Sequence, residues 1–295
     1  MNTANRSNTL LASYLSSPLF LLLGLVILVP EIIAVVMSFT NYAPGLATEF
    51  VGFDNYVDVV TDPQFWNAAK NTLVFVVAVV ALQIVIALAI CMLLARTVKR
   101  TAVWLAIVLV PSAMSPAVLG VTWKFLFDQD AGPINYLLGL VGIERVTWFA
   151  QPGTAMVAVV IAYVWFSVPS SVILLYPAVS TVPSELYEAA QIDGAGPMRT
   201  FTRVVLPTIL PAVAVASIFR MIIAIRAFGE VYVLSGGGPS RGTEILGLYL
   251  YRIGFEQFEW GRAAAVGIVM LVITVVAASP QIRLLSRQMV AGDRA

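Results

Sequence analysis

Long apolar stretches, separated by short polar segments, dominate this chain. A helix needs about 20 predominantly apolar residues to cross the hydrocarbon core of a bilayer. Stretches of this kind occur six times, and we expect a transmembrane helix in each. The predicted spans are Tyr14–Phe39, Thr72–Ala95, Ala102–Phe127, Gly153–Val179, Val204–Ala227 and Arg262–Leu285. The pattern therefore predicts an all-α, polytopic membrane protein with six transmembrane helices.

The composition agrees with this prediction. Of the 295 residues, 60% are hydrophobic and 11% are charged, and the mean hydropathy is +0.91. A soluble domain carries roughly 25% charged residues, so the charges here are too few to cover a water-facing surface. The net charge of +1 gives no reason to expect nucleic acid as a partner.

Prolines lie within or near the ends of the predicted spans. A transmembrane helix tolerates proline where neighbouring helices or polar side chains satisfy the freed carbonyl groups. We therefore expect kinked helices around a pathway. The prolines concerned are Pro30, Pro111, Pro116, Pro169, Pro211 and Pro280.

The distribution of Lys and Arg predicts the orientation. With a cytoplasmic N-terminus, nine of the 17 cations fall in cytoplasmic segments, six in external loops and two in the fifth span. Cytoplasmic loops of membrane proteins carry the excess of Lys and Arg, so both termini are predicted to be cytoplasmic. The expected organisation is a cytoplasmic segment 1–13, a six-helix membrane domain 14–289 and a cytoplasmic tail 290–295.

A polar, helix-prone segment, residues 181–203, lies between the fourth and fifth spans, on the predicted cytoplasmic side. Ser184 is placed to cap a helix by accepting a backbone N–H. Glu185 and Glu188 lie in the first turns, where negative charge is favourable. Three small or apolar side chains at helical spacing are expected to share one face; they are Leu186, Ala189 and Ala190.

The same segment contains a predicted helix break followed by a second short helix. Asp193 and Gly194 end the first helix, and Gly194 is suited to the left-handed conformation at the C-terminal cap. Pro197 suits the first turn of the second helix, expected over 198–203. The fifth membrane span follows directly, so a push on this helix pair would reach the membrane helices.

The spacing of these residues matches a known motif. Glu188-Ala189-Ala190, Gly194 and Val204-x-Leu206-Pro207 follow the order EAA-x3-G-x9-[IV]-x-LP. The segment resembles the EAA loop of the inner-membrane permease subunits of bacterial ATP-binding-cassette (ABC) importers, where the loop couples the permease to a separate ATPase. The resemblance implies that ATPase coupling involves Glu185, Glu188, Ala189, Ala190, Asp193, Gly194 and Pro207.

Other segments resemble the carbohydrate branch of that family. They are Phe53-Asp54-Asn55-Tyr56, Asp62-Pro63-Gln64-Phe65-Trp66, Asn71-Thr72, Pro111-Ser112-Ala113-Met114-Ser115-Pro116, Trp123-Lys124-Phe125-Leu126-Phe127 and Tyr232-Val233-Leu234-Ser235-Gly236-Gly237-Gly238-Pro239. The chain is therefore similar to the permease subunit of a maltose-like or glycerol-phosphate-like type I ABC importer. It shows no large inserted external domain, which is similar to the compact six-helix form of that family.

The resemblance implies the assembly and the mechanism. A heterodimer of two permease subunits in the bacterial inner membrane would sit on two ABC ATPase subunits, which bind ATP and Mg²⁺. An extracytoplasmic binding protein would deliver a sugar or related polyol. ATP-driven closure of the ATPases would then open and close the pathway by alternating access.

Ionisable residues inside membrane spans are candidates for function, because a buried charge in lipid costs several kcal/mol unless it is paired or faces a wet cavity. Arg220 is near the middle of the fifth span, Arg226 is near its outer end, and Glu31 follows Pro30 in the first. An internal Arg–Glu pair or snorkelling would explain Arg220 structurally. Alternatively, Arg220 faces the solute path together with Phe219 and Met221.

The tryptophans have two possible roles. A tryptophan near a membrane–water interface usually anchors its helix, whereas sugars also stack on aromatic rings. Trp165, within the fourth span, is the best candidate for the second role. The predicted substrate-path residues are thus Trp165, Phe219, Arg220 and Met221.

The sequence contains no catalytic or metal-binding motif that we recognise. There is no G-x-x-x-x-G-K-[ST] phosphate loop, no histidine, and a single cysteine, Cys91. We therefore expect no enzyme activity, no metal site and no cofactor in this chain. A self-contained secondary transporter is the alternative function, but it would usually have an internal repeat and an intramembrane acid or histidine. A membrane-embedded enzyme would need convergent catalytic groups.

Overall fold

The computed structural model describes residue 18 and residues 22–96 and 100–292. Over these residues the regular structure is helical, apart from one isolated bridge between Thr40 and Phe50. The all-α prediction is therefore confirmed for this part of the chain. By their contacts the residues form two compact units, Met1–Asp62 with Leu250–Leu271, and Pro63–Tyr249 with Val272–Ala295.

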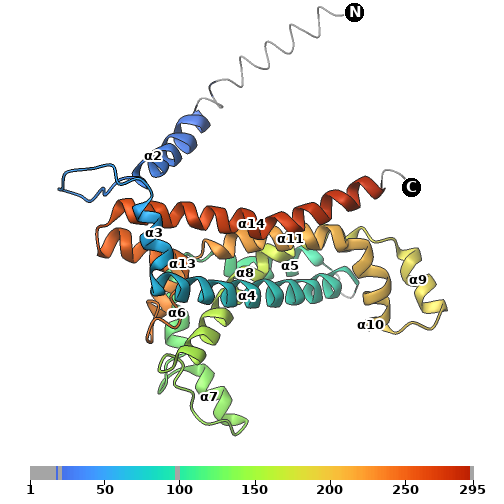
Figure 1. Ribbon diagram of the computed structural model, residues 1–295. Helices are drawn as coiled ribbons and strands as arrows, with labels where there is room; N and C mark the ends of the chain where they lie inside the picture. Colours follow the sequence, from blue (N-terminus) through green and yellow to red (C-terminus); the bar gives the residue numbers. More distant parts are fainter. Residues whose placement is uncertain (1–17, 19–21, 97–99, 293–295) are drawn as a thin grey trace, which may run out of the picture. The chain divides into compact units, whose positions relative to one another are not determined.

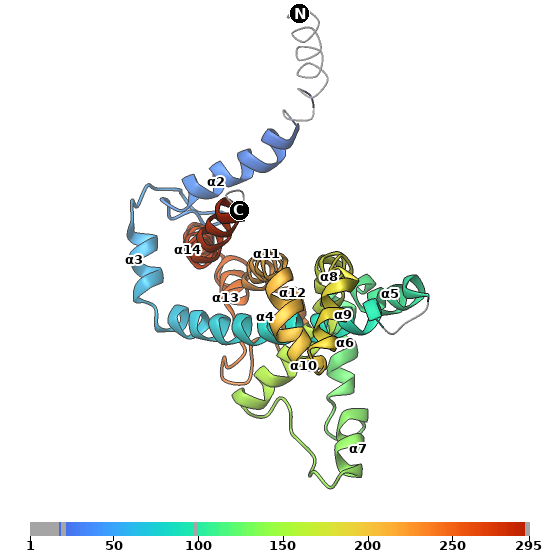
Figure 2. The same ribbon diagram turned by 90° about the vertical axis from the view of Figure 1, so that its right-hand side faces the viewer.

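The helices of the two units are shown in Figures 1 and 2. In chain order they are α2 (Val29–Met37), α3 (Asp54–Thr61), α4 (Pro63–Arg96), α5 (Thr101–Leu109), α6 (Pro116–Leu126), α7 (Pro133–Leu140), α8 (Pro152–Ser180), α9 (Ser184–Ile192), α10 (Pro197–Thr200), α11 (Leu206–Ile225), α12 (Gly229–Ser235), α13 (Leu246–Tyr251) and α14 (Trp260–Gly292). Short 3₁₀ or π-helical segments occupy Gly24–Leu28, Val110–Ala113, Phe201–Val205 and Arg252–Glu256.

Four helices are long and apolar enough to cross a membrane: Pro63–Ala95, Pro152–Ser180, Pro197–Ile225 and Trp260–Gln281. They correspond to the second, fourth, fifth and sixth predicted spans. The first predicted span is described only in part, and its described helix, Gly24–Met37, is shorter than a membrane crossing. Most of its residues before 22 lie outside the described residues, so the count of six stays a prediction.

The third predicted span, Ala102–Phe127, is broken. The helices Thr101–Ala113 and Pro116–Leu126 meet at an angle of 92°, which is a far sharper change of direction than the kink expected at Pro111 and Pro116. Each proline lacks an N–H donor, and between them Met114 has an extended backbone. The second helix then begins anew, because the Ser115 hydroxyl accepts the N–H of Val118 at 3.3 Å.

Helix α8 is the centre of the larger unit. It contacts α4, α11, α12, α6 and α5, and more than one of its faces is buried. A helix that is apolar all round belongs in the interior of a bundle. Small residues let its neighbours approach closely, and those buried on α8 include Ala155, Ala158, Ala162, Ser167 and Ser171.

The first helix of the larger unit starts earlier than predicted. Helix α4 begins at Pro63 instead of Thr72, because proline suits the first helical position. Its first turns bind the segment after α12: the Asn71 amide nitrogen donates to the carbonyls of Arg241 and Glu244, at 2.9 and 3.1 Å. The N–H of Leu246 donates to the Thr72 hydroxyl at 2.8 Å.

In the smaller unit, side chains tie the loops to their helices. The Asn55 amide donates to the carbonyls of Ser38 and Thr40, at 2.9 and 2.8 Å. Arg262 forms an ion pair with Asp62, at 2.8 Å. These contacts order a segment that carries part of the carbohydrate-permease resemblance.

A close contact between α6 and α12 generates a prediction. A Cβ atom on Gly120 would lie 2.6 Å from the Cβ of Val233, so the substitution Gly120→Ala requires the helices to move apart. We expect it to lower the free energy of unfolding by about 1–3 kcal/mol. Cys91 is the only cysteine and is fully buried, so thermal unfolding can be followed by its reaction with a fluorogenic maleimide.

The matched control is Gly139→Ala in α7, where a Cβ would have no neighbour within 4 Å. Alanine is the better helix former, so this variant should unfold at the same or a higher temperature. Equal unfolding temperatures for Gly120→Ala and the unsubstituted protein would contradict the contact.

Candidate functional site

The segment predicted to couple to an ATPase forms two short helices, α9 and α10. In Figure 1 they lie at the end of the larger unit where α4 ends and α11 begins. Helix α9 ends in a complete Schellman motif: the N–H of Ala195 donates to Ala190 O at 2.9 Å, and the N–H of Gly194 donates to Gln191 O at 3.0 Å. This motif needs a left-handed residue, and Gly194 has φ +70°. The predicted role of Gly194 as the helix end is confirmed.

The start of α9 differs from the prediction. Ser184 is the first helical residue, and Pro183, in an extended conformation, occupies the cap position without a side-chain cap. The predicted cap by Ser184 is therefore wrong, because the backbone turns into the helix one residue earlier. Pro197 begins α10 as predicted.

Most of the predicted coupling residues of α9 are exposed. Glu185, Glu188, Ala189 and Asp193 face solvent, whereas Ala190 is buried. The expected single face of Leu186, Ala189 and Ala190 is therefore divided, with Ala190 anchoring the helix and the other two outside. Large apolar side chains are exposed beside them: Ile192 is 86% exposed and Met198 is 74% exposed.

The helix pair is continuous with a membrane span. Helix α10 passes through the π-helical turn Phe201–Val205 into α11, and together they form one apolar helix, Pro197–Ile225. Pro207 lies exposed in the first turn of α11. A displacement of α10 would therefore move α11 directly, without a flexible linker between them.

The four predicted substrate-path residues do not share one surface. The side chains of Trp165 and Phe219 are exposed on α8 and α11, at 41% and 51%. Arg220 and Met221 are buried within the larger unit, at 4% and 9% exposure. Only the two aromatic residues therefore present a surface that a passing solute could meet in this conformation.

Arg220 binds an amide, and not the glutamate that one of the explanations considered from the sequence would require. Its Nε donates to Gln83 Oε1 at 2.9 Å, and the Ser171 hydroxyl donates to the same oxygen at 3.4 Å. Within the described residues no ion pair of Arg220 occurs. Gln83 is not among the predicted site residues, although it is the only amide in the apolar stretch 73–95 of α4, and that isolation could have revealed it. Arg226 is exposed at the end of α11, which is compatible with snorkelling.

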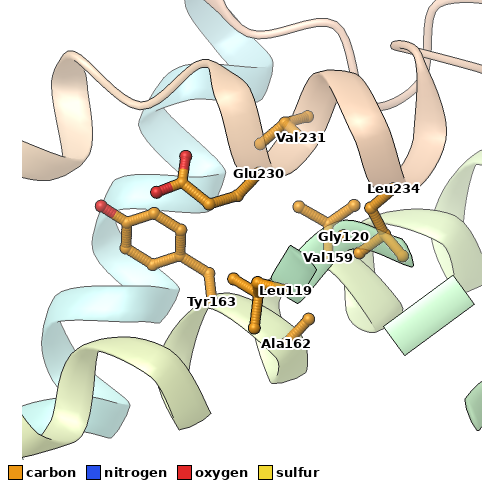
Figure 3. A pocket seen from close by; sticks show the side chains of 8 residues that line it. All are labelled: Leu119, Gly120, Val159, Ala162, Tyr163, Glu230, Val231 and Leu234. Carbon is orange, nitrogen blue, oxygen red and sulfur yellow. The ribbon is translucent and has the colours of Figure 1, made fainter. Parts of the chain in front are cut away.

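A narrow gap lies between α6, α8 and α12. It is lined mostly by apolar side chains, and Figure 3 shows the hydroxyl of Tyr163 and the carboxylate of Glu230 pointing toward one another in it. Polar groups from two helices, α8 and α12, thus meet in a mostly apolar lining. Within the described residues no group of three or more His, Cys, Asp or Glu could hold a metal ion.

Comparisons with known proteins identify relatives over the part of the chain that contains α9, α10 and α11. Residues 86–288 match the family described as binding-protein-dependent transport system inner membrane component. The diacetylchitobiose uptake system permease protein of Streptomyces coelicolor is 36% identical, over 82% of this chain and 75% of its own length. A probable ABC transporter permease protein of Sinorhizobium fredii is 31% identical, over 91% of this chain and 88% of its own length. The fold resembles a chain of a bacterial alginate ABC transporter, with a TM-score of 0.79, 23% identity and 96% coverage of both chains.

The left-handed residue at the end of α9 generates a prediction. Gly194→Ala should destabilise the α9 end by about 1–2 kcal/mol, because a residue with a Cβ is strained at positive φ, and no atom lies within 4 Å of the new Cβ to add a clash. Gly194→Asn should cost less, since asparagine tolerates this conformation. Amide hydrogen exchange of α9 would measure the effect.

Gly196→Ala is the matched control, two residues away, with φ −69° and open space around its Cβ. It should leave exchange in α9 unchanged. Identical exchange in the Gly194→Ala and Gly196→Ala variants would show that the motif does not hold this end of the helix.

Proposed function

Because this chain belongs to the family of binding-protein-dependent transport system inner membrane components, we propose that it forms part of the path of a bacterial ABC importer for a sugar or related polyol. The family assignment confirms the interpretation as an importer permease and decides against the self-contained secondary transporter. It also places ATP hydrolysis on a separate subunit, since the family consists of membrane components.

The carbohydrate class rests on the named relatives. Besides the diacetylchitobiose permease, a trehalose/maltose transport system permease protein of Thermococcus litoralis is 34% identical, over 77% of this chain and 76% of its own length. The external segments that resemble carbohydrate permeases support the same class. A polyhydroxylated solute also suits the exposed aromatic rings of Trp165 and Phe219, on which sugar rings can stack.

The observation that carries the coupling proposal is the continuity of α10 with α11. One ABC ATPase would bind the exposed surface of α9 and α10 through Glu185, Glu188, Ala189 and Asp193, with Ile192 and Met198 supplying apolar contact. Ala190 and Gly194 hold the shape of the helix pair, and Pro207 lies where it joins the span. ATP and Mg²⁺ are assigned to the ATPase, and this chain needs no cofactor or metal of its own.

We infer the remaining parts of the assembly from the same family assignment. A second permease subunit would complete the path, two ATPases would drive it, and an extracytoplasmic protein would deliver the solute. The positive-inside distribution supports cytoplasmic N- and C-termini in the inner membrane, with lipid around the apolar spans. The coupling helices then face the cytoplasm, where ATP is available. Nucleic acid has no role.

The four path candidates take different roles in this proposal. Trp165 and Phe219 are exposed and would contact the solute directly. Met221 and Arg220 lie behind them in the bundle, where they support the wall of the path. This division follows burial, since a solute can touch only side chains that reach the path.

Reversing a coupling charge should separate the permease from its ATPase. We expect Glu188→Lys to abolish co-purification of the ATPase and to lower uptake by roughly 30-fold or more, because an unpaired interfacial charge costs about 2–5 kcal/mol. Membrane insertion should be unaffected, since Glu188 is exposed. Pull-down in mild detergent and labelled-sugar uptake would measure both.

The control for this experiment is Glu144→Lys, which reverses an exposed acid in a predicted external loop. It should leave ATPase co-purification unchanged. Normal co-purification and uptake with Glu188→Lys would refute the coupling assignment, and ATP-independent uptake by the purified chain alone would refute the importer proposal.

Replacement of the exposed ring on α11 should weaken solute contact. We expect Phe219→Leu to raise the KM for uptake roughly two- to tenfold, as for the loss of an aromatic contact of about 0.5–1.5 kcal/mol. Phe219→Tyr keeps the ring and should leave KM close to its original value. An unchanged KM in both variants would remove Phe219 from the path.

A further inference from the structure

One side-chain oxygen lies where three long helices meet. Oε1 of Gln83, on α4, accepts the Nε–H of Arg220 from α11 at 2.9 Å and the hydroxyl of Ser171 from α8 at 3.4 Å. Gln83 and Ser171 are fully buried, and Arg220 is 4% exposed. All three helices belong to the segments that are long and apolar enough to cross a membrane. Gln83 therefore joins three such helices inside the larger unit.

The contact with Arg220 is moderate in strength because Gln83 is neutral. Within the described residues Arg220 forms no ion pair. A carboxylate in place of the amide would add the attraction between unlike charges, which is strong in an interior of low dielectric constant. Breaking such a pair would leave two uncompensated buried charges. The amide thus holds α11 by a contact that separates more readily than an ion pair.

Hydrogen bonding around this turn of α11 is also incomplete. Nε2 of Gln83 is buried and has no hydrogen-bond partner in the described part of the chain. At the next residue of α11, Met221, Nε2 of Gln281 from α14 lies 4.0 Å from the sulfur, which is a weak acceptor. Oε1 of Gln281 is buried without a partner among the described residues. Because unpartnered buried polar groups are unfavourable, these polar contacts do not lock α11 in this position.

The helix that Gln83 holds is the one that the coupling helices would displace. Helix α11 is continuous with α10, whereas α8 packs most extensively on α4. A movement of α11 away from α4 would lengthen the distance between Arg220 Nε and Gln83 Oε1. The contact at this point therefore opposes the movement, and its strength decides how readily α11 moves.

We propose that Gln83 is a positioning residue for transport, which holds Arg220, and with it α11, by a neutral contact that breaks when α11 moves. This inference rests on the proposed function, because it assigns the movement of α11 to the coupling helices. Ser171 fixes the amide from α8, so that its oxygen faces α11. The balance between holding and release depends on the absence of charge at Gln83.

The test changes the charge of Gln83 at nearly constant shape. Gln83→Glu places a carboxylate against Arg220, so the protein should unfold at a higher temperature, followed by maleimide reaction of Cys91. The maximal uptake rate should fall roughly tenfold, because a stronger contact must break in each transport cycle. KM should stay constant, since the solute does not touch this residue. A purely structural role for Gln83 would give a more stable protein with an unchanged rate.

A second variant keeps the inference testable if Gln83→Glu fails to fold. Gln83→Met/Arg220→Met replaces both partners by apolar side chains, which leaves no unpaired buried charge and should retain stability. The maximal rate should still fall roughly fivefold or more, in the range of measured coupling effects, because α11 loses its hold on α4. KM should again stay constant.

Ser171→Ala tests the link to α8. It should lower the unfolding temperature of the unsubstituted protein but not that of Gln83→Met/Arg220→Met, where its acceptor is absent. The matched control is Ser167→Ala, about one turn earlier on α8 and 1% exposed, whose hydroxyl bonds the Val164 carbonyl of its own helix at 3.3 Å. This control should leave the maximal rate unchanged.

Three results would overturn the inference and leave the proposed function intact. A full uptake rate in Gln83→Glu or in Gln83→Met/Arg220→Met would show that the contact does not control the movement of α11. An unchanged or lower unfolding temperature of Gln83→Glu would show that Arg220 does not meet this side chain. A rise in KM at constant maximal rate would show direct solute contact. Failure of the proposed function would instead appear as ATP-independent uptake by the unsubstituted chain.

Discussion

The bilayer offers no hydrogen-bond partners to the backbone, and the rest of this structure follows from that constraint. In the hydrocarbon region every N–H and C=O must be satisfied within the protein, so membrane-spanning segments are helical. The described residues are helical in all four long apolar segments. The constraint also explains why a break inside an apolar segment is informative, since unpaired backbone there must be covered by protein or line a wet cavity.

The break between α5 and α6 is such a place. Two prolines remove donors, and Ser115 starts the second helix by capping it. The second helix then rests against α12 so closely that Gly120 has no room for a side chain. The position of α6 is thus fixed by its contact with α12.

In the proposed coupling, force enters the larger unit through α9 and α10. A glycine with positive φ closes α9, and α10 runs into α11 as one helix. A rigid helix transmits displacement along its axis, whereas a flexible linker would absorb it. Inside the bundle, the buried Arg220 of α11 donates a hydrogen bond to Gln83 of α4, so this side-chain contact joins the two helices in addition to their packing.

The sequence by itself determined that the chain is a membrane protein, that its fold is all-α and that a helix pair separates the fourth and fifth spans. Hydrophobic length predicted the long helices, and local chemistry predicted that α9 ends at Gly194 and that α10 starts at Pro197, because caps depend on residues only a few positions apart. The 92° break, the early start of α4, the cap at Pro183 and the burial of Ala190 were decided by tertiary structure. So were the hydrogen bond between Arg220 and Gln83 and the approach of Tyr163 to Glu230, since the partners are far apart in the chain. Periodicity shows that a residue lies in an apolar helix, but only packing shows which neighbour its side chain meets.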